Sequence, residues 1–163
     1  FRSPAAAGER NVLVFEDAAG DGWVCQAWLG YYSSRGGQIE INPACSQGAV
    51  IHEIGHALGI MHEHSRFDSA QFIAPRPFAE SSPHYQTIGA VGSRTTYDLC
   101  SVMHYSNRQA AADQVPWFEL TAAGRANFNS CKSALPPSCR QVGQRCTLSP
   151  ADVAFINAVY RDR

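Results

Sequence analysis

Four of the chain's six histidines fall within thirteen consecutive residues, HEIGHALGIMHEH at positions 52–64. If this stretch is helical, His52 and His56 are four residues apart and project from the same face. Two imidazoles at that spacing can bind one metal ion at roughly 2.0–2.1 Å. Glu53 is too close to them along the chain to share the ion easily, but it is placed to contact a water bound there. The HExxH pattern therefore supplies two ligands and a general base.

A third ligand is predicted beyond a glycine. Gly59 follows His56 by three residues, and a glycine can adopt positive φ and turn the chain sharply off the helix. His62, three residues further on, can then return to the same ion. Three neutral imidazoles with an open position for water are typical of a catalytic zinc site. The sequence thus predicts one Zn²⁺ ion held by His52, His56 and His62.

HExxH alone also occurs by chance on helices, with histidines that simply bond to backbone in the core. Gly59 and His62 in register argue against chance, because the longer pattern is far more specific. A second element fits it: SVMHYS, residues 101–106, places Met103 on a tight turn two residues before Tyr105. We name residues 101–106 the Met-turn and expect Met103 to form an apolar floor for the imidazoles rather than an ordinary core contact.

The other histidines are not predicted to bind metal. His64, His84 and His104 have no spacing that makes them ligands, and we expect them to be solvated or to lie behind the ligands.

The elements around the motif can be outlined from hydrophobic patterns. A helix is predicted from about Gln47 to Leu58, ended by Gly59. Strands are predicted at Asn11–Phe15 and Gln38–Asn42, and Trp23–Tyr32 is either a strand or irregular.

The rest of the chain is predicted to contain more loops. Residues 65–99 are expected to form loops with one short helix around Tyr85, and residues 106–147 are loop-rich. Residues 148–163 form a terminal helix with Ser149 as its cap and Pro150 at its first position. One face of this helix is apolar apart from an asparagine, and it consists of Val153, Ile156, Asn157 and Tyr160.

Charge and composition exclude several classes of function. The net charge is −1, and Lys and Arg form no long block, so nothing favours binding to nucleic acid or to an anionic membrane. No apolar run approaches the roughly 18 residues that span a bilayer. The six cysteines form no CxxC pair, and an even, dispersed set favours disulfides and an extracellular location over buried thiols in the cytosol. Because no signal peptide begins the chain, we expect a processed form.

The sequence resembles the astacins, a branch of the metzincin zinc endopeptidases. Glu63 follows the third histidine, as in astacins, and SVMHY is the astacin form of the Met-turn. VGQR at 142–145, followed by LSPADVAFINAVY, is similar to the C-terminal segment of the family. The similarity extends from about Asn11 to Tyr160.

The resemblance implies an α+β fold and one catalytic domain, residues 1–163. Its upper lobe, about 1–62, would carry a small twisted sheet and the zinc-binding helix. The lower lobe, about 63–163, would be loop-rich and end in the C-terminal helix. The ion would lie on the floor of a cleft between the lobes.

The resemblance also implies a secreted, monomeric zinc endopeptidase that acts on proteins or peptides. Glu53 would be the general base and acid. By resemblance, Tyr105 is a further zinc ligand that moves away and bonds the reaction intermediate, and Arg145 selects Asp or Glu just after the cleaved bond. The alternatives are a catalytically silent metal-binding module, a zinc-storage or structural site, and an inactive fragment without its N-terminal portion.

The chain also departs from the family pattern. It starts after the family's first strand and long helix, so we expect a pro-segment or a missing N-terminal segment as a partner. Phe1 is therefore not expected to act as the mature N-terminus that the family links to the glutamate equivalent to Glu63.

The cysteines agree with the family only in part. By resemblance, Cys25 pairs with Cys45. The other four cysteines allow three pairings. We predict Cys131–Cys139 from their short separation and Cys100–Cys146 from the family, in which the segments that carry them border one side of the cleft.

Overall fold

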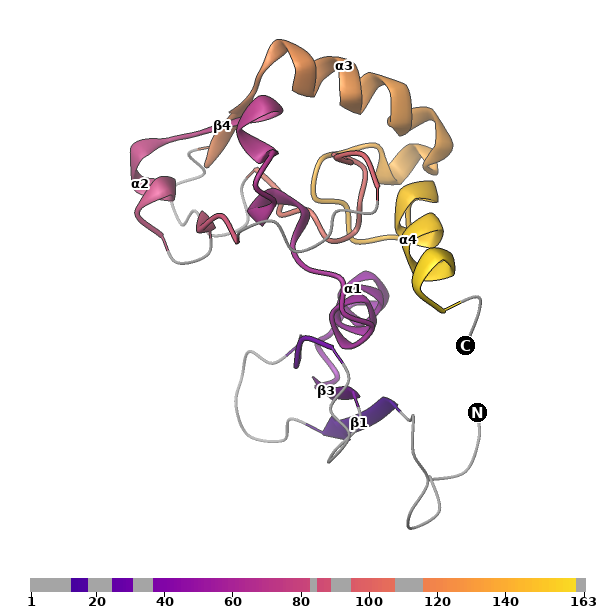
Figure 1. The fold of residues 1–163 in the computed structure, drawn as a ribbon. Helices are drawn as coiled ribbons and strands as arrows, with labels where there is room; N and C mark the ends of the chain where they lie inside the picture. Colours follow the sequence, from indigo (N-terminus) through magenta and orange to yellow (C-terminus); the bar gives the residue numbers. More distant parts are fainter. Residues whose placement is uncertain are drawn as a thin grey trace. The chain divides into compact units, whose positions relative to one another are not determined.

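The computed structural model describes residues 13–17, 25–30, 37–82, 85–88, 95–107 and 116–160. The chain divides into two compact units, Phe1–Met61 and His62–Arg163, and each is described by itself. Short strands and helices occur in both (Figure 1), which confirms the predicted α+β class. Among the described residues, no helix has the length and apolar character needed to cross a bilayer.

The first unit contains a three-stranded sheet in the order β1-β3-β2. Strand β1 (Leu13–Asp17) runs parallel to β3 (Gly37–Ile41), and β2 (Cys25–Ala27) runs antiparallel to β3. Alternation along β3 turns Ile39 inward, where it is fully buried, because successive side chains of a strand point to opposite faces. The strand predicted at 38–42 is present as β3, one residue earlier. The strand predicted at 11–15 overlaps β1, and its residues 11 and 12 lie outside the described residues.

Helix α1 (Gln47–Ala57) carries the first two predicted zinc ligands and packs on β2 and β3 (Figure 1). Ser46 caps it by accepting a hydrogen bond from an amide of the first turn. Gly59 has φ of 86°, and the amides of Gly59 and Ile60 return to carbonyls of the last turn at 2.8 and 2.9 Å. This Schellman arrangement needs a left-handed residue, which glycine adopts without steric cost.

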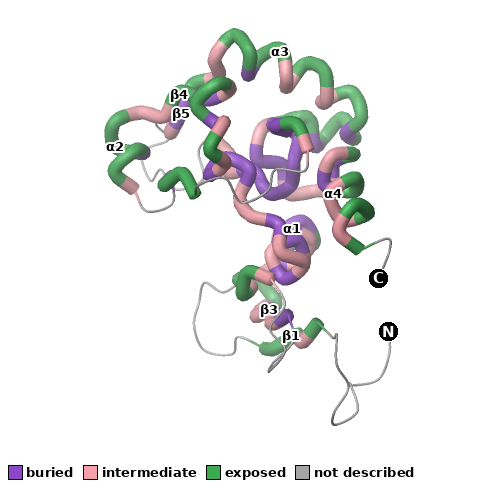
Figure 2. Tube along the Cα trace, viewed as in Figure 1, coloured by how far each residue is buried: buried purple, intermediate pink, exposed green. Residues whose placement is uncertain are grey.

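The second unit pairs strand β4 (Ile73–Pro75) with β5 (Phe118–Leu120) in antiparallel fashion. Its helices are α2 (Pro77–Glu80), α3 (Ala122–Cys131) and α4 (Pro150–Tyr160). Short 3₁₀ turns lie at Glu63–Ser65, Ser69–Gln71, Lys132–Ala134 and Pro137–Cys139. Figure 2 shows exposed positions along α2 and α3 and buried positions on the inner segments of this unit. Its main core consists of Ile73, Ala79, Tyr85, Tyr97, Leu99 and Phe118.

Helix α3 corrects the prediction of a loop-rich segment at 106–147. Its sequence, AAGRANFNSC, is polar and lacks a strong apolar stripe. The helix is stabilised instead by its surroundings: Thr121 caps it by accepting from the Gly124 amide at 3.0 Å. Gly124 also lies so close to the backbone of Phe72 that a Cβ there would collide with it. The short helix predicted around Tyr85 is matched at Tyr85 itself, which has a 3₁₀ conformation, while residues 83–84 are outside the described residues and α2 lies upstream.

Helix α4 begins with a reciprocal cap. The Asp152 amide donates to Ser149 Oγ at 3.0 Å, and the Ser149 amide donates to Asp152 Oδ2 at 2.9 Å. This capping box satisfies amides that the helix leaves without partners, as the sequence predicted for Ser149. The apolar face is not buried as a whole, because Val153 is 43% and Tyr160 39% exposed.

All six cysteines are paired, but two of the three expected pairs are wrong. Cys25 is bonded to Cys45, the pair that the resemblance implied. The other two disulfides are Cys100–Cys131 and Cys139–Cys146, not Cys131–Cys139 and Cys100–Cys146.

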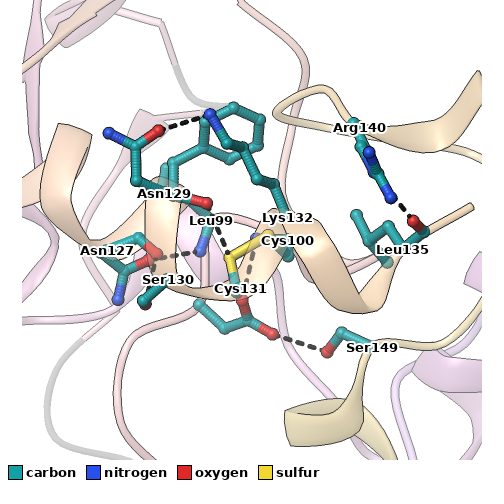
Figure 3. The surroundings of a disulfide bond; sticks show 12 residues. Leu99, Cys100, Asn127, Asn129, Ser130, Cys131, Lys132, Leu135, Arg140 and Ser149 are labelled. Atoms are coloured by element: carbon teal, nitrogen blue, oxygen red, sulfur yellow. Dashed lines mark hydrogen bonds between the residues drawn. A yellow bond between two sulfur atoms is a disulfide. The ribbon is translucent and has the colours of Figure 1, made fainter. Parts of the chain in front are cut away.

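The cause of this error is the unpredicted helix α3. The helix ends at Cys131 and places its Cα 6.1 Å from that of Cys100 (Figure 3). Cys139 then folds back within the C-terminal segment, with its Cα 6.0 Å from that of Cys146. Disulfides require Cα separations of about 4.4–6.8 Å, so the three-dimensional path rather than the sequence separation selects the partners.

Peptide mapping under non-reducing conditions should recover these pairs. Trypsin should release residues 95–108 linked to 126–132, and residues 133–140 linked to 146–161, because Arg and Lys separate all four cysteines. Reduction should split both species into their component masses. A linked 126–132 and 133–140 species would contradict the structure.

Candidate metal centre

The two histidines of helix α1 lie close enough together to bind one metal ion. Their rings meet edge to face with centroids 4.6 Å apart, and His52 is 5% exposed. His56 Nδ1 lies 2.8 Å from the Ile60 carbonyl oxygen. Since a carbonyl can only accept, Nδ1 carries the proton and Nε2 is the nitrogen able to bind an ion.

His62 completes the set within the continuous segment 52–62. One nitrogen each from His52, His56 and His62 lies within 4.8 Å of the others. Three imidazoles converging in this way fit a zinc ion with an open position, as the sequence predicted. A further group of potential ligands among the described residues, Asp98, Cys100 and Cys131, is not comparable because both sulfurs are in a disulfide.

Glu53, the predicted base, is 7% exposed on α1 beside His52. A carboxylate is rarely buried in proteins unless it has a function or a partner. Glu53 shares helix α1 with His52 and His56.

Every backbone amide from Cys100 to Tyr105 donates a hydrogen bond. The acceptors are Asp98 Oδ1 (2.8 Å), Asp98 O (3.1 Å), Asp152 Oδ2 (3.1 Å), Ser101 Oγ (2.9 Å), Ser101 O (3.2 Å) and His64 Nδ1 (3.3 Å), in chain order. Met103, within this stretch, is fully buried. Satisfying the buried amides in this way allows an irregular segment to lie inside the protein.

The carbonyls of the same stretch are held by the C-terminal segment. Gln144, itself fully buried, donates from Nε2 to the carbonyl of Cys100 at 3.1 Å. Arg145 Nη1 donates to the carbonyls of Val102 and His104 at 2.7 and 3.0 Å.

Two further contacts hold the Met-turn. The Glu63 amide donates to the Met103 carbonyl at 3.2 Å, which joins the end of the histidine motif to the Met-turn. Gly143, with φ of 69°, lies against the backbone of Ser106, where a Cβ would collide.

Helix α4 also contributes to the Met-turn. Asp152 is 5% exposed, and its carboxylate accepts from Ser101 Oγ at 2.6 Å as well as from the Val102 amide. Charge-assisted bonds of this kind are stronger than neutral ones. The same carboxylate therefore caps α4 and fixes the Met-turn.

Glu63 is buried and contacts two residues of the second unit. Its Oε1 accepts from the Asp98 amide at 2.8 Å and lies 3.2 Å from Arg66 Nη1. Burial raises the pKa of Glu63 to about 8, and Arg66 only partly opposes this. Asp68 holds the Arg66 guanidinium in turn, at 2.8 and 2.9 Å. Phe1 and its expected separation from Glu63 lie outside the described residues.

Two histidines that were not predicted to bind metal are buried. His104 is fully buried, and its Nε2 lies 2.8 Å from the Tyr97 hydroxyl. Burial lowers the pKa of His104 to about 4, so this ring is neutral at pH 7. His64 is 2% exposed, not solvated, and His84 is outside the described residues.

Tyr105, the predicted stabiliser, lies among these rings. Its ring centroid is 4.4 Å from that of His62 and 4.1 Å from that of His64. The phenol is therefore beside the third ligand. No spacing in the sequence predicts the contact with His64, which depends on the path of the chain between residues 64 and 105.

The comparisons with known proteins agree with this geometry. The sequence profile of the astacin peptidase family matches residues 1–161. The chain is 32% identical over 146 residues to Nematocyst expressed protein 6 of Nematostella vectensis, covering 84% of this chain and 46% of that protein. It is 30% identical to the astacin-like metalloendopeptidase of Gallus gallus over 93% of this chain and 34% of that one.

A solved structure shares the fold. High choriolytic enzyme 1, a hatching enzyme zinc-protease from Oryzias latipes, superposes with a TM-score of 0.65 at 25% identity, over 95% of this chain and 71% of that one. The chain spans less than half the length of the two relatives described above. The profile match over nearly the whole sequence, together with the three converging histidines, shows that the chain belongs to the astacin family of peptidases.

Proposed function

We propose that this chain is the catalytic domain of a zinc-dependent endopeptidase that cleaves proteins or peptides. The observation that carries the proposal is the convergence of His52, His56 and His62 in a chain of the astacin family. We also propose that its two units are the upper and lower lobes of this domain, and that the protein acts as a secreted monomer. Three disulfides support secretion, because such bonds persist in oxidising compartments.

The three histidines would hold one zinc ion through their neutral rings. A bound zinc ion lowers the pKa of a coordinated water toward about 7 and polarises a carbonyl. The hydrogen bond from His56 Nδ1 to Ile60 supports this by fixing the tautomer of one ligand.

Glu53 would take the proton from the attacking water and deliver it to the leaving amine. A carboxylate can perform both steps when it lies within hydrogen-bond reach of the water, directly beside the ligands. Its low exposure, 7%, favours this role because bulk water competes less for the proton.

Tyr105 would donate a hydrogen bond to the oxyanion that forms on the substrate carbonyl. Its position beside His62, 4.4 Å between ring centroids, supports this role. The densely bonded Met-turn leaves the Tyr105 backbone little freedom, so only the side chain would move from its place as a further zinc ligand to the oxyanion, at little reorganisation cost.

Arg145 would select an acidic residue just after the cleaved bond. A guanidinium can grip a carboxylate through two parallel bonds. It carries five N–H groups, so contacts from Nη1 to the Met-turn are compatible with contacts from its other nitrogens to a substrate.

Replacing Arg145 with alanine should reduce the preference for an acidic residue at that subsite by roughly 1–3 kcal/mol, the scale of a charged hydrogen bond. The measure is the ratio of kcat/KM for two peptides that differ only in Asp or Ala after the cleaved bond. A loss common to both peptides reports the contacts to the Met-turn and cancels in the ratio. Arg140→Ala, in the same disulfide loop, is the control and should leave the ratio unchanged. An unchanged ratio in Arg145→Ala would show that another residue selects the acidic side chain at this subsite.

A casein or fluorogenic-peptide assay with and without a chelator tests the proposal as a whole. Cleavage that a chelator stops and zinc restores is expected. Zinc bound without cleavage would favour the silent module or a structural site, and cleavage that resists complete zinc removal would refute the zinc mechanism.

A further inference from the structure

The peptide bond between His104 and Tyr105 is held at both ends. Its N–H, on Tyr105, donates to His64 Nδ1 at 3.3 Å. Its C=O, on His104, accepts from Arg145 Nη1 at 3.0 Å. Because a peptide unit is planar, two opposed contacts fix the rotation of this plane about the chain.

The ring of His64 also restricts the Tyr105 side chain directly. The two rings are 4.1 Å apart between centroids and inclined by 30°. On its other sides, His64 stacks on His62 at 5.0 Å and meets Tyr85 at 4.8 Å. His64 is only 2% exposed, so this packing leaves it little room to move.

We infer that His64 is a positioning residue for Tyr105, an inference that rests on the proposed role of the Tyr105 phenol. The orientation of the His104–Tyr105 plane sets the direction in which Tyr105 leaves the backbone, and the His64 ring sets where the phenol then lies. A donor aimed at an oxyanion loses much of its effect when displaced by about 1 Å. His64 thus supports the reaction without touching the substrate.

A purely structural His64 would behave differently. If it only filled space in the core, its replacement would lower stability and affect kcat regardless of what stands at position 105. If it positions the phenol, its effect on kcat should depend on the hydroxyl of Tyr105. Coupling of this kind is what a double-mutant cycle measures.

Two variants separate the two contacts of His64. His64→Phe keeps a ring of similar shape and removes the acceptor for the Tyr105 amide. His64→Asn keeps an acceptor close to the place of Nδ1 and removes the ring. Tyr85→Phe is the matched control: it alters another ring in contact with His64 and removes a hydroxyl that has no hydrogen-bond partner in the structure, within the described residues.

The cycle combines His64→Phe with Tyr105→Phe in the zinc-loaded enzyme. Tyr105→Phe should lower kcat by about 10²–10³-fold, as for other oxyanion donors. His64→Phe should lower kcat by about tenfold with little change in KM, the scale of one hydrogen bond, and His64→Asn should retain more of kcat. In the Tyr105→Phe background, His64→Phe should have an effect of less than about twofold. Tyr85→Phe should match the wild type.

A second readout does not depend on turnover. A phenolate bound to Cu²⁺ absorbs visible light, so the copper-substituted enzyme should show a band that disappears in Tyr105→Phe and shifts or weakens in His64→Phe. Equal loss of kcat by His64→Phe with and without the Tyr105 hydroxyl, or an unchanged copper band, would overturn the inference. Full activity of Tyr105→Phe would instead refute the proposed role of Tyr105.

Discussion

Replacing His56 with alanine should abolish both zinc binding and proteolysis. His56 is the middle ligand of the set, and its hydrogen bond to Ile60 through Nδ1 leaves Nε2 as the nitrogen that can bind the ion. Two remaining imidazoles bind zinc too weakly to survive dialysis, since catalytic sites use three protein ligands. Atomic absorption should therefore find one zinc ion per wild-type chain and none in the variant, and cleavage of casein should fall to background.

His84→Ala provides the comparison, because the spacing of His84 does not make it a ligand and it should retain both zinc and activity. Circular dichroism of the His56→Ala variant should show that helix α1 persists, since Ser46 and Gly59, which cap it, are unchanged. Stoichiometric zinc in a folded His56→Ala variant would show that the ion is held elsewhere.

The second large effect is expected from Glu53→Gln, which should keep zinc and lose nearly all turnover. Glutamine preserves the size of the side chain but cannot accept the proton of the water. Loss of general acid–base catalysis should lower kcat by about 10²–10⁴-fold. Both the zinc content and kcat of the variant must be measured, because only their combination separates a missing base from a missing metal.

Glu40→Gln is the matched control for this change. Glu40 is a carboxylate of the same unit, on strand β3, where it accepts a hydrogen bond from Gln26 at 2.6 Å. The same substitution there should leave kcat unchanged. Cleavage at the wild-type rate by zinc-loaded Glu53→Gln would remove Glu53 as the base.

The part of the site within residues 52–62 could be predicted, because its geometry depends on residues that are close in sequence. Helical periodicity alone places His52 and His56 on one face, and the need for positive φ explains Gly59. The end of α1 at Gly59 and the cap of α4 at Ser149 were likewise predicted from the sequence, since capping depends on contacts within four residues.

The supports of the Met-turn could not be predicted in the same way. Arg145 reaches the carbonyls of Val102 and His104 across 43 and 41 residues of sequence. Arg145 and Tyr105 could be identified from family motifs, but no pattern in the sequence indicates that Arg145 bonds the Met-turn, which carries Tyr105. Such contacts depend on the tertiary path of the chain.

The sequence did not predict helix α3 or two of the three disulfides, because these too depend on tertiary contacts. A polar helix has no periodic signal, and its stability comes from Thr121, from the close contact of Gly124 and from the Cys131 bridge. Tertiary contacts of this kind outweigh intrinsic propensity. The helix determines where Cys131 lies. Because the helix was not predicted, Cys131 was assigned the wrong disulfide partner.

The bond from the Val102 amide to Asp152 has a consequence for synthesis. The acceptor follows the donor by 50 residues, so a ribosome that adds roughly 5–20 residues per second makes it roughly 3–10 s later. Throughout that interval the nascent Met-turn lacks Asp152, and for most of it the Met-turn also lacks Gln144 and Arg145. The first unit and helix α1 can fold before then, whereas the Met-turn can only be set after translation has passed the start of α4. Assembly of the Met-turn is therefore timed by the synthesis of helix α4.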